Sequence, residues 1–136
     1  MNEMALRHDW EAWRGHAHHA RPWPAIVKFY QERIADGIPL QPLLQLVESV
    51  SQSSVANQIF AATSMSTLLI SDTEDFRAGD GVLRVMYHPE KKSFEFHHRA
   101  FSGLHDKKIC PEAEALPTLR LFLRLKYGIL FETLST

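Results

Sequence analysis

The sequence predicts one α+β domain with N-terminal helices, a three-stranded antiparallel meander and a C-terminal helix packed on one face of the sheet. Apolar residues recur at helical spacing through residues 24–50, alternate with polar ones in residues 66–101, and return to helical spacing at residues 112–126. A length of 136 residues is typical of a single domain. We therefore expect residues 1–23 to form a helix and a histidine-rich arm, and residues 24–136 to form the domain.

The N-terminal part of the chain is predicted to form three helices. Leu6, Trp10 and Trp13 recur every three or four residues and share one helical face. A second helix is expected from Pro24 to Asp36, because proline suits the first helical turn. A third helix begins near residues 39–42 and continues to residue 50, with leucines and valines on one side.

The middle of the chain is predicted to form the sheet. Residues 66–71 are rich in leucine and isoleucine, and residues 82–88 and 93–101 alternate between apolar and polar side chains. The serine-containing residues 51–62 either end the third helix or form a short fourth helix, and both alternatives remain open.

Pairing His88 with Ser93 fixes which side chains share a face of the predicted hairpin. The apolar face then contains Leu83, Val85, Tyr87, Phe94, Phe96 and His98. The polar face contains Arg84, Met86, His88, Glu95, His97 and Arg99. This division is expected of an antiparallel hairpin that is covered on one side.

The C-terminal part is predicted to contain a loop at residues 102–111 and a helix at residues 112–126. The apolar side of this helix is broad, because Leu121 and Leu125 widen the stripe of inward-facing residues. Such breadth is typical of a helix packed between two layers. Residues 129–131 form a short apolar tail that is a candidate for a docked strand.

Composition excludes several classes of protein. Fifteen basic and sixteen acidic side chains give a net charge of −1, which disfavours binding to a polyanion. The single cysteine, Cys110, cannot form an intramolecular disulfide, and we expect it to be an inert structural or surface residue. Residues 1–14 lack an apolar secretory core, and no apolar run is long enough to cross a membrane. A cytoplasmic location is expected by elimination, and no cofactor motif is found.

Histidines provide the candidate metal ligands. His16, His18 and His19 lie close together in the arm, where neutral imidazoles are good ligands for divalent metals. No cysteine or carboxylate lies near enough in sequence to complete a tetrahedral set, so a solvated loop is favoured.

A second histidine group is expected on the polar face of the hairpin. His88, His97 and Glu95 share this face, which makes a metal or acid–base site sterically feasible. His98 points to the opposite side and cannot ligate the same ion from this strand. No known ligand spacing or nucleophile motif is present, so a mixed-charge exposed face is favoured.

The absence of a catalytic motif favours a non-enzymatic protein-interaction domain of a small bacterial-type cytoplasmic protein. Its size and architecture are comparable with those of small inhibitors, immunity proteins and chaperones or adaptors, which is an analogy and rests on no motif. The predicted partner-binding residues are Arg84, His88, Glu95, His97, Arg99, Trp10 and Trp13. The tryptophans, together with Trp23, are favoured as core residues and are anchors in the alternative. The partner is another protein, with a homodimer as a further option.

Two other classes of function remain as alternatives. The first is a histidine-dependent, metal-assisted hydrolase that uses His88, His97 and Glu95. The second is a nucleic-acid-binding module, which the balanced charge makes the weaker of the two. Its candidate cations are Arg84, Arg99, Lys91, Lys92, Lys107 and Lys108.

Overall fold

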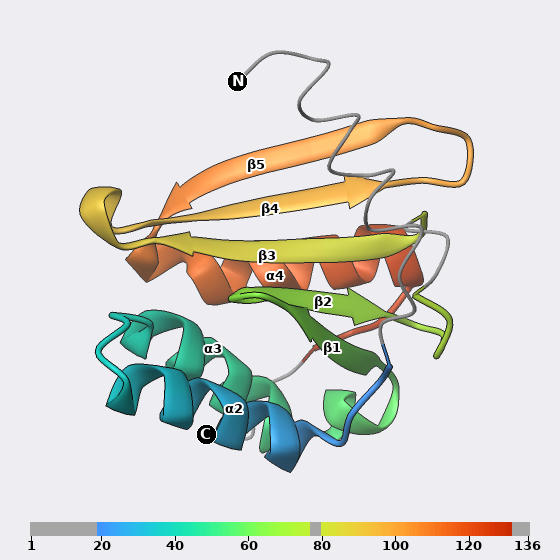
Figure 1. Ribbon diagram of the computed structural model, residues 1–136. Coiled ribbons are helices and arrows are strands. Elements are labelled where there is room, and N and C mark those ends of the chain that lie inside the picture. Colours follow the sequence, from blue (N-terminus) through green and yellow to red (C-terminus); the bar gives the residue numbers. More distant parts are fainter. Residues whose placement is uncertain (1–18, 77–79, 132–136) are drawn as a thin grey trace.

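The computed structural model describes residues 19–76 and 80–131 (Figure 1). The helices are α2 (Trp23–Ala35), α3 (Gln41–Ser51) and α4 (Ala115–Tyr127). The strands are β1 (Phe60–Ser64), β2 (Thr67–Ser71), β3 (Val82–His88), β4 (Ser93–Arg99) and β5 (His105–Pro111). Short 3₁₀ turns are η1 (Ser54–Asn57), η2 (Pro89–Lys91) and η3 (Glu112–Glu114). The predicted α+β class is confirmed, but the sheet has five strands instead of three.

The five strands form an antiparallel meander, in which each strand pairs with its neighbours along the chain (Figure 1). His88 pairs with Ser93, and Leu83 pairs with His98, as the sequence predicts. The side chains that share each face of the β3–β4 hairpin are therefore confirmed, because side chains alternate along each strand. The polar face is not the exposed face that the sequence predicts, since His97 is buried and Arg84, His88, Glu95 and Arg99 are half-buried.

β1 corrects the alternatives for residues 51–62. The helix that follows α3 is the 3₁₀ turn η1, which Ser53 caps by accepting a hydrogen bond from the Val55 amide at its hydroxyl oxygen. The chain then extends, and Phe60 to Ser64 pair with Ser71 to Thr67. Alanines at the centre of β1 favour a helix by propensity, but pairing with the apolar β2 overrides that preference.

β5 corrects the predicted loop at residues 102–111. It pairs with β4 along its whole length, from Arg99–His105 to Ser93–Pro111. In this strand Cys110 is buried, whereas the neighbouring side chains are exposed or half-buried. Because both sides of the strand carry charged residues, the sequence shows no alternating pattern there.

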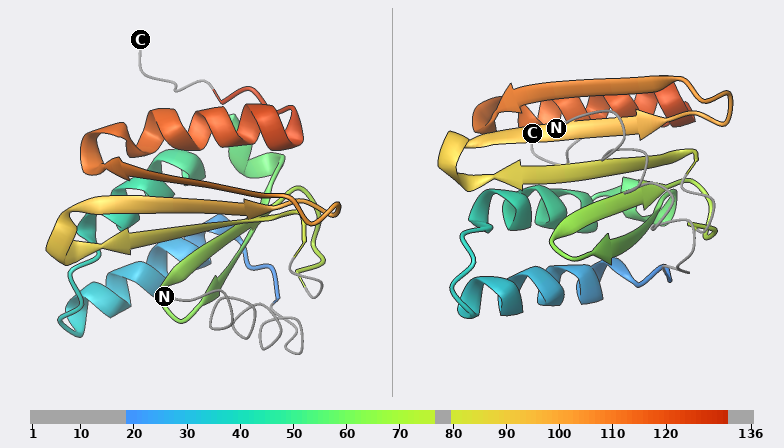
Figure 2. Two further views of the ribbon diagram at one scale, coloured as in Figure 1. Left: turned by 90° about the horizontal axis from the view of Figure 1, so that it is seen from above. Right: turned by 45° about the horizontal axis from the view of Figure 1, so that its top comes forward.

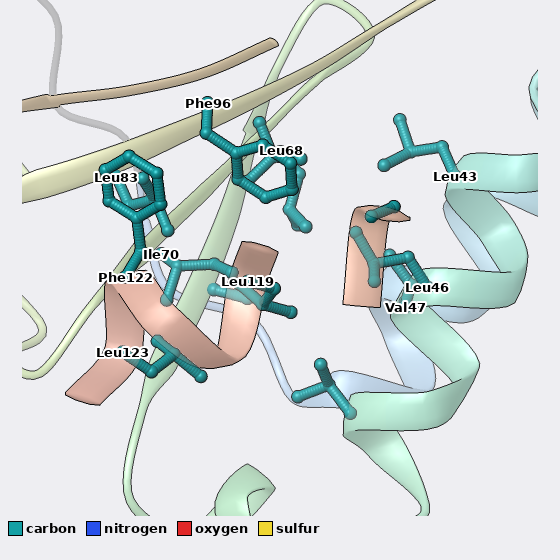
Figure 3. Close-up of a cluster of buried hydrophobic side chains, with 14 of the residues drawn as sticks. Leu43, Leu46, Val47, Leu68, Ile70, Leu83, Phe96, Leu119, Phe122 and Leu123 are labelled. Atoms are coloured by element: carbon teal, nitrogen blue, oxygen red, sulfur yellow. The ribbon is translucent and has the colours of Figure 1, made fainter. Parts of the chain in front are cut away.

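The core lies between one face of the sheet and the three helices (Figure 3). α2 and α3 form a pair next to β1 and β2, while α4 runs along β3 and β4 (Figures 1 and 2). Phe96 of β4 stacks on Phe122 of α4, with ring centroids 5.8 Å apart. Trp23 is buried at the start of α2, where its indole N–H donates to the Ile59 carbonyl oxygen. No helix in the described ranges combines the length and the apolar character that a membrane span requires.

The chain turns back on itself after α4. Gly128 adopts a left-handed conformation with φ 66°, and its amide donates to the Arg124 carbonyl oxygen. Ile129 and Phe131 are buried, so the apolar tail does dock on the domain. It docks without forming a strand, which corrects that expectation, and the Arg120 side chain donates to the Phe131 carbonyl oxygen.

Candidate functional site

The polar face of β3 and β4 brings together the sheet residues that the sequence predicts as a contact surface. Glu95 lies between two basic partners: His88 Nε2 is 3.1 Å from its Oε1, and Lys107 Nζ is 3.6 Å from its Oε2. Arg99 pairs with Asp80 at 3.1 Å. The carboxylates of Glu95 and Asp80 are therefore each paired with a cation, Lys107 and Arg99 respectively.

His97 has a different environment from His88, although both lie on this face. Its Nε2 is 2.8 Å from Nδ1 of His105 on β5, and the residue is 4% exposed. Burial lowers the pKa of His97 to about 4, and the positive potential of His105 and Arg84 acts in the same direction. Near neutral pH the ring is thus uncharged, which suits a hydrogen-bonded pair of imidazoles.

His105 and Lys107 are members of this face that the sequence-based prediction misses. Both belong to β5, which the sequence predicts as a loop. The register places Lys107 directly opposite His97 and His105 diagonally across from it. Alternation over residues 105–111 would have been the signal, but the charged edge strand does not show it.

The candidate metal ligands do not form a ligand set within the described ranges. Among residues 19–76 and 80–131, no three histidine, cysteine, aspartate or glutamate side chains are arranged to hold an ion. His19 is exposed. His16, His18, Trp10 and Trp13 lie outside the described residues.

His98 occupies the core side of β4, as predicted. Its ring contacts the edge of Tyr127, with ring centroids 5.7 Å apart, and neither ring nitrogen has a hydrogen-bond partner among the described residues. Burial lowers the pKa of His98, and the charge of Lys126 adds to this effect. Cys110 is also buried, so of the two expected roles, structural or surface residue, the structural one is observed.

The cations proposed for nucleic-acid binding do not lie on one face. Lys107 is on the polar face opposite His97, whereas its neighbour Lys108 points to the other side of the sheet. Lys91 and Lys92 lie at the turn between β3 and β4. These candidate cations are thus divided between separate surfaces.

The outer side of α4 carries exposed apolar side chains beside a hollow. Leu121 and Leu125 on the helix are 43% and 65% exposed, and Leu130 on the tail is 68% exposed. Arg120 and Arg124 flank them. We call these five residues the α4 surface. Between the helix and the tail, the surface contains a shallow hollow of about 360 Å³.

The exposure of these leucines corrects the expectation that α4 is packed between two layers. The inner side of α4 contributes Leu119, Phe122 and Leu123 to the core (Figure 3). No second layer covers the outer side in the part of the chain that the structure describes, because Leu121 and Leu125 remain open to solvent there. The broad apolar stripe is therefore only partly used by the fold.

A second hollow lies at the start of α2, near η1 and β1. It measures about 540 Å³, and Arg21, Trp23, Phe60 and Glu74 contribute to its wall. Arg21 is held there by a hydrogen bond from Nη2 to the Thr63 hydroxyl oxygen. Neither hollow is lined by the histidines of the polar sheet face.

Comparisons with known proteins leave the function to be argued from these surfaces. No protein-family model, no curated protein and no solved structure matches this chain. The choice among interaction, catalysis and nucleic-acid binding therefore depends on the exposure, charge and pairing described above.

Proposed function

We propose that this chain is a non-enzymatic protein-interaction domain and that the α4 surface is its principal contact region. The observation that carries the proposal is the exposure of three leucines on the outer side of α4 and the tail. Leu121 and Leu130 line one hollow, and Leu125 lies one helical turn after Leu121. Contiguous exposed apolar side chains with arginines at the margin are typical of protein-binding surfaces. Removing the exposed surface of these leucines from water would be favourable in free energy, so a function in which a partner covers them is favoured.

The arrangement of the titratable groups supports interaction over catalysis. His88 is engaged with Glu95, and His97 is engaged with His105. His97 lies beside two cations, Arg84 and Lys107, and their positive charge disfavours binding of a metal ion. The hydrolase alternative needs His88, His97 and Glu95 to converge on a substrate. Instead, His88 and Glu95 contact each other and His97 contacts His105.

The polar sheet face remains the second proposed contact region. Arg84, His88, Glu95, His97 and Arg99 share this face with side chains of the edge strand β5. On β5 itself, Ile109 is 58% exposed, which adds an apolar element to a charged surface. The roles of inhibitor, immunity protein or chaperone, and the cytoplasmic location, belong to the same proposal and rest on size and architecture alone.

Affinity capture with surface variants tests the proposal. The tagged chain is used to recover proteins from its native host, with wild type compared with Leu121→Glu and Leu125→Glu. Leu104→Glu serves as the matched control, because Leu104 is 63% exposed on the turn between β4 and β5. Arg84→Glu and Arg99→Glu test the polar sheet face in the same experiment.

A partner that is lost with the two α4 variants and retained with Leu104→Glu supports the α4 surface. Loss confined to Arg84→Glu and Arg99→Glu, with an intact fold by circular dichroism, moves the contact to the sheet face. Equal recovery by all five folded variants contradicts the proposed surfaces, and hydrolytic turnover that depends on His97 contradicts the proposed class.

A further inference from the structure

The two ends of α4 carry opposite charges that have no partner in the described ranges. Glu114, immediately before the helix, and Arg124, near its end, are both exposed. Neither forms an ion pair with another residue of the described chain. Ten residues separate them, which corresponds to about 15 Å along a helix.

Both charges lie on the same side of the helix as the exposed leucines. Glu114 is the N-cap residue of α4, and Leu121 follows it by seven residues, about two helical turns, which brings the start of the helix close to the line of Leu121. Arg124 and Leu125 follow three and four residues later and flank that line on either side. Pro117 lies one turn before Leu121 and lines the same hollow. The outer side of α4 is thus apolar at its centre, acidic at its start and basic near its end.

We infer that a second copy of this chain covers the α4 surface, with the two α4 helices antiparallel about a two-fold axis. This inference rests on the proposed function and names the partner. An axis that passes midway between Glu114 and Arg124 places each Arg124 next to the partner's Glu114, so that two equivalent ion pairs form. The same axis brings Leu121 against the partner's Pro117.

Side-chain size is also self-complementary in this arrangement. Leu125 projects one turn beyond Leu121, and the antiparallel register brings it near the partner's η3 turn, which contains Ala113. Ala113 is exposed and small, so it leaves space for a leucine. An unrelated partner would have to supply this combination of charge and shape, whereas a second copy supplies it by symmetry.

Sedimentation equilibrium and light scattering of the untagged full chain test the dimer. Over about 1 to 200 µM, wild type is expected to approach twice the single-chain mass of 15.6 kDa. Leu121→Glu is expected to shift the chain to monomer, because it places two carboxylates at the centre of the interface. Leu104→Glu is expected to leave the mass unchanged.

Charge exchange separates this dimer from non-specific association. Glu114→Arg and Arg124→Glu are each expected to weaken dimerisation at least about tenfold, because each change creates two like-charge contacts in a symmetric pair. The double variant carrying both substitutions restores the opposite-charge pairs and is expected to recover most of the wild-type affinity. Glu32→Arg and Lys28→Glu, at exposed positions of α2, are the matched controls.

The outcomes distinguish the dimer from the wider proposal. A wild-type chain that stays monomeric at 200 µM, or a double variant no stronger than either single variant, overturns the dimer. Unchanged circular dichroism shows that each variant retains its fold, and unfolding temperatures are compared at a concentration low enough for every variant to be monomeric, because dimerisation itself raises the unfolding temperature. The capture experiment decides separately whether another protein uses the α4 surface, so the proposed function survives a failed dimer.

Discussion

Acidification is expected to destabilise this protein through His97. In the unfolded chain a histidine titrates near 6.5, whereas burial lowers the pKa of His97 in the folded chain to about 4. Between these two values the unfolded state binds more protons than the folded state, so the free energy of unfolding decreases as the pH decreases. Above pH 6.5 the ring is neutral in both states, and it contributes no pH dependence there.

The size of the effect follows from the difference between the two pKa values. Each pKa unit corresponds to 1.36 kcal/mol, so the contribution reaches about 3 kcal/mol by pH 4. Solvent screens this interaction little, because His97 is 4% exposed. A loss of this size is a substantial part of the 5–15 kcal/mol typical of a domain.

Urea unfolding at several pH values between 4 and 7.5 measures the contribution. Carboxylates titrate in the lower part of this range, so wild type is compared with His97→Gln, which keeps a polar partner for His105 and does not titrate. The stability difference between the two proteins is expected to change by about 3 kcal/mol across the range, with wild type losing more on acidification. His19→Gln, at an exposed histidine, is the control. A wild-type and His97→Gln pair that respond equally to pH refutes the reasoning.

Three further predictions concern the fold. Phe96→Ala removes a fully buried ring that stacks on α4 and is expected to cost about 3–5 kcal/mol in urea unfolding; a cost below about 1 kcal/mol contradicts the described packing. Gly81→Ala places a methyl group 2.7 Å from the Phe101 ring at φ +76°, and is expected to cost about 1–3 kcal/mol. The added Phe101→Ala change is expected to recover the steric part of this loss but not the backbone part. Tyr127→Phe removes a hydroxyl that lies 2.7 Å and 3.2 Å from the carbonyl oxygens of Gly81 and Ile70, and is expected to lower the unfolding free energy by about 1–3 kcal/mol; an unchanged thermal midpoint would argue that water replaces it.

The sequence predicts the central hairpin better than the edges of the sheet. β3 and β4 carry a strong period-two pattern because one face is buried, and a slip of one residue would expose Phe94 and Phe96. β1 and β5 lie at the edges. Edge strands tolerate small and charged side chains, and the alanines of β1 and the lysines of β5 therefore show no alternation of apolar and polar residues.

The candidate site shows the same division. Alternation alone predicts that His88, Glu95 and His97 share a face, and the register confirms it. The partner of His97 could not be predicted, because His105 belongs to a strand that the sequence does not reveal. The state of the ring follows from that pairing and from its burial, which are properties of the assembled sheet.

The sequence by itself determined the α+β class, the helices α2, α3 and α4 and the side chains that share each face of the β3–β4 hairpin, because periodicity is a local property of the chain. Tertiary structure alone decided that β5 completes the sheet, that His97 is uncharged, and that the outer leucines of α4 remain uncovered in the described chain. The physical reason is that burial depends on which distant segments meet. The sequence shows that α4 has a broad apolar stripe whose burial is favourable. Only the assembled fold shows which part of that stripe the described domain leaves exposed.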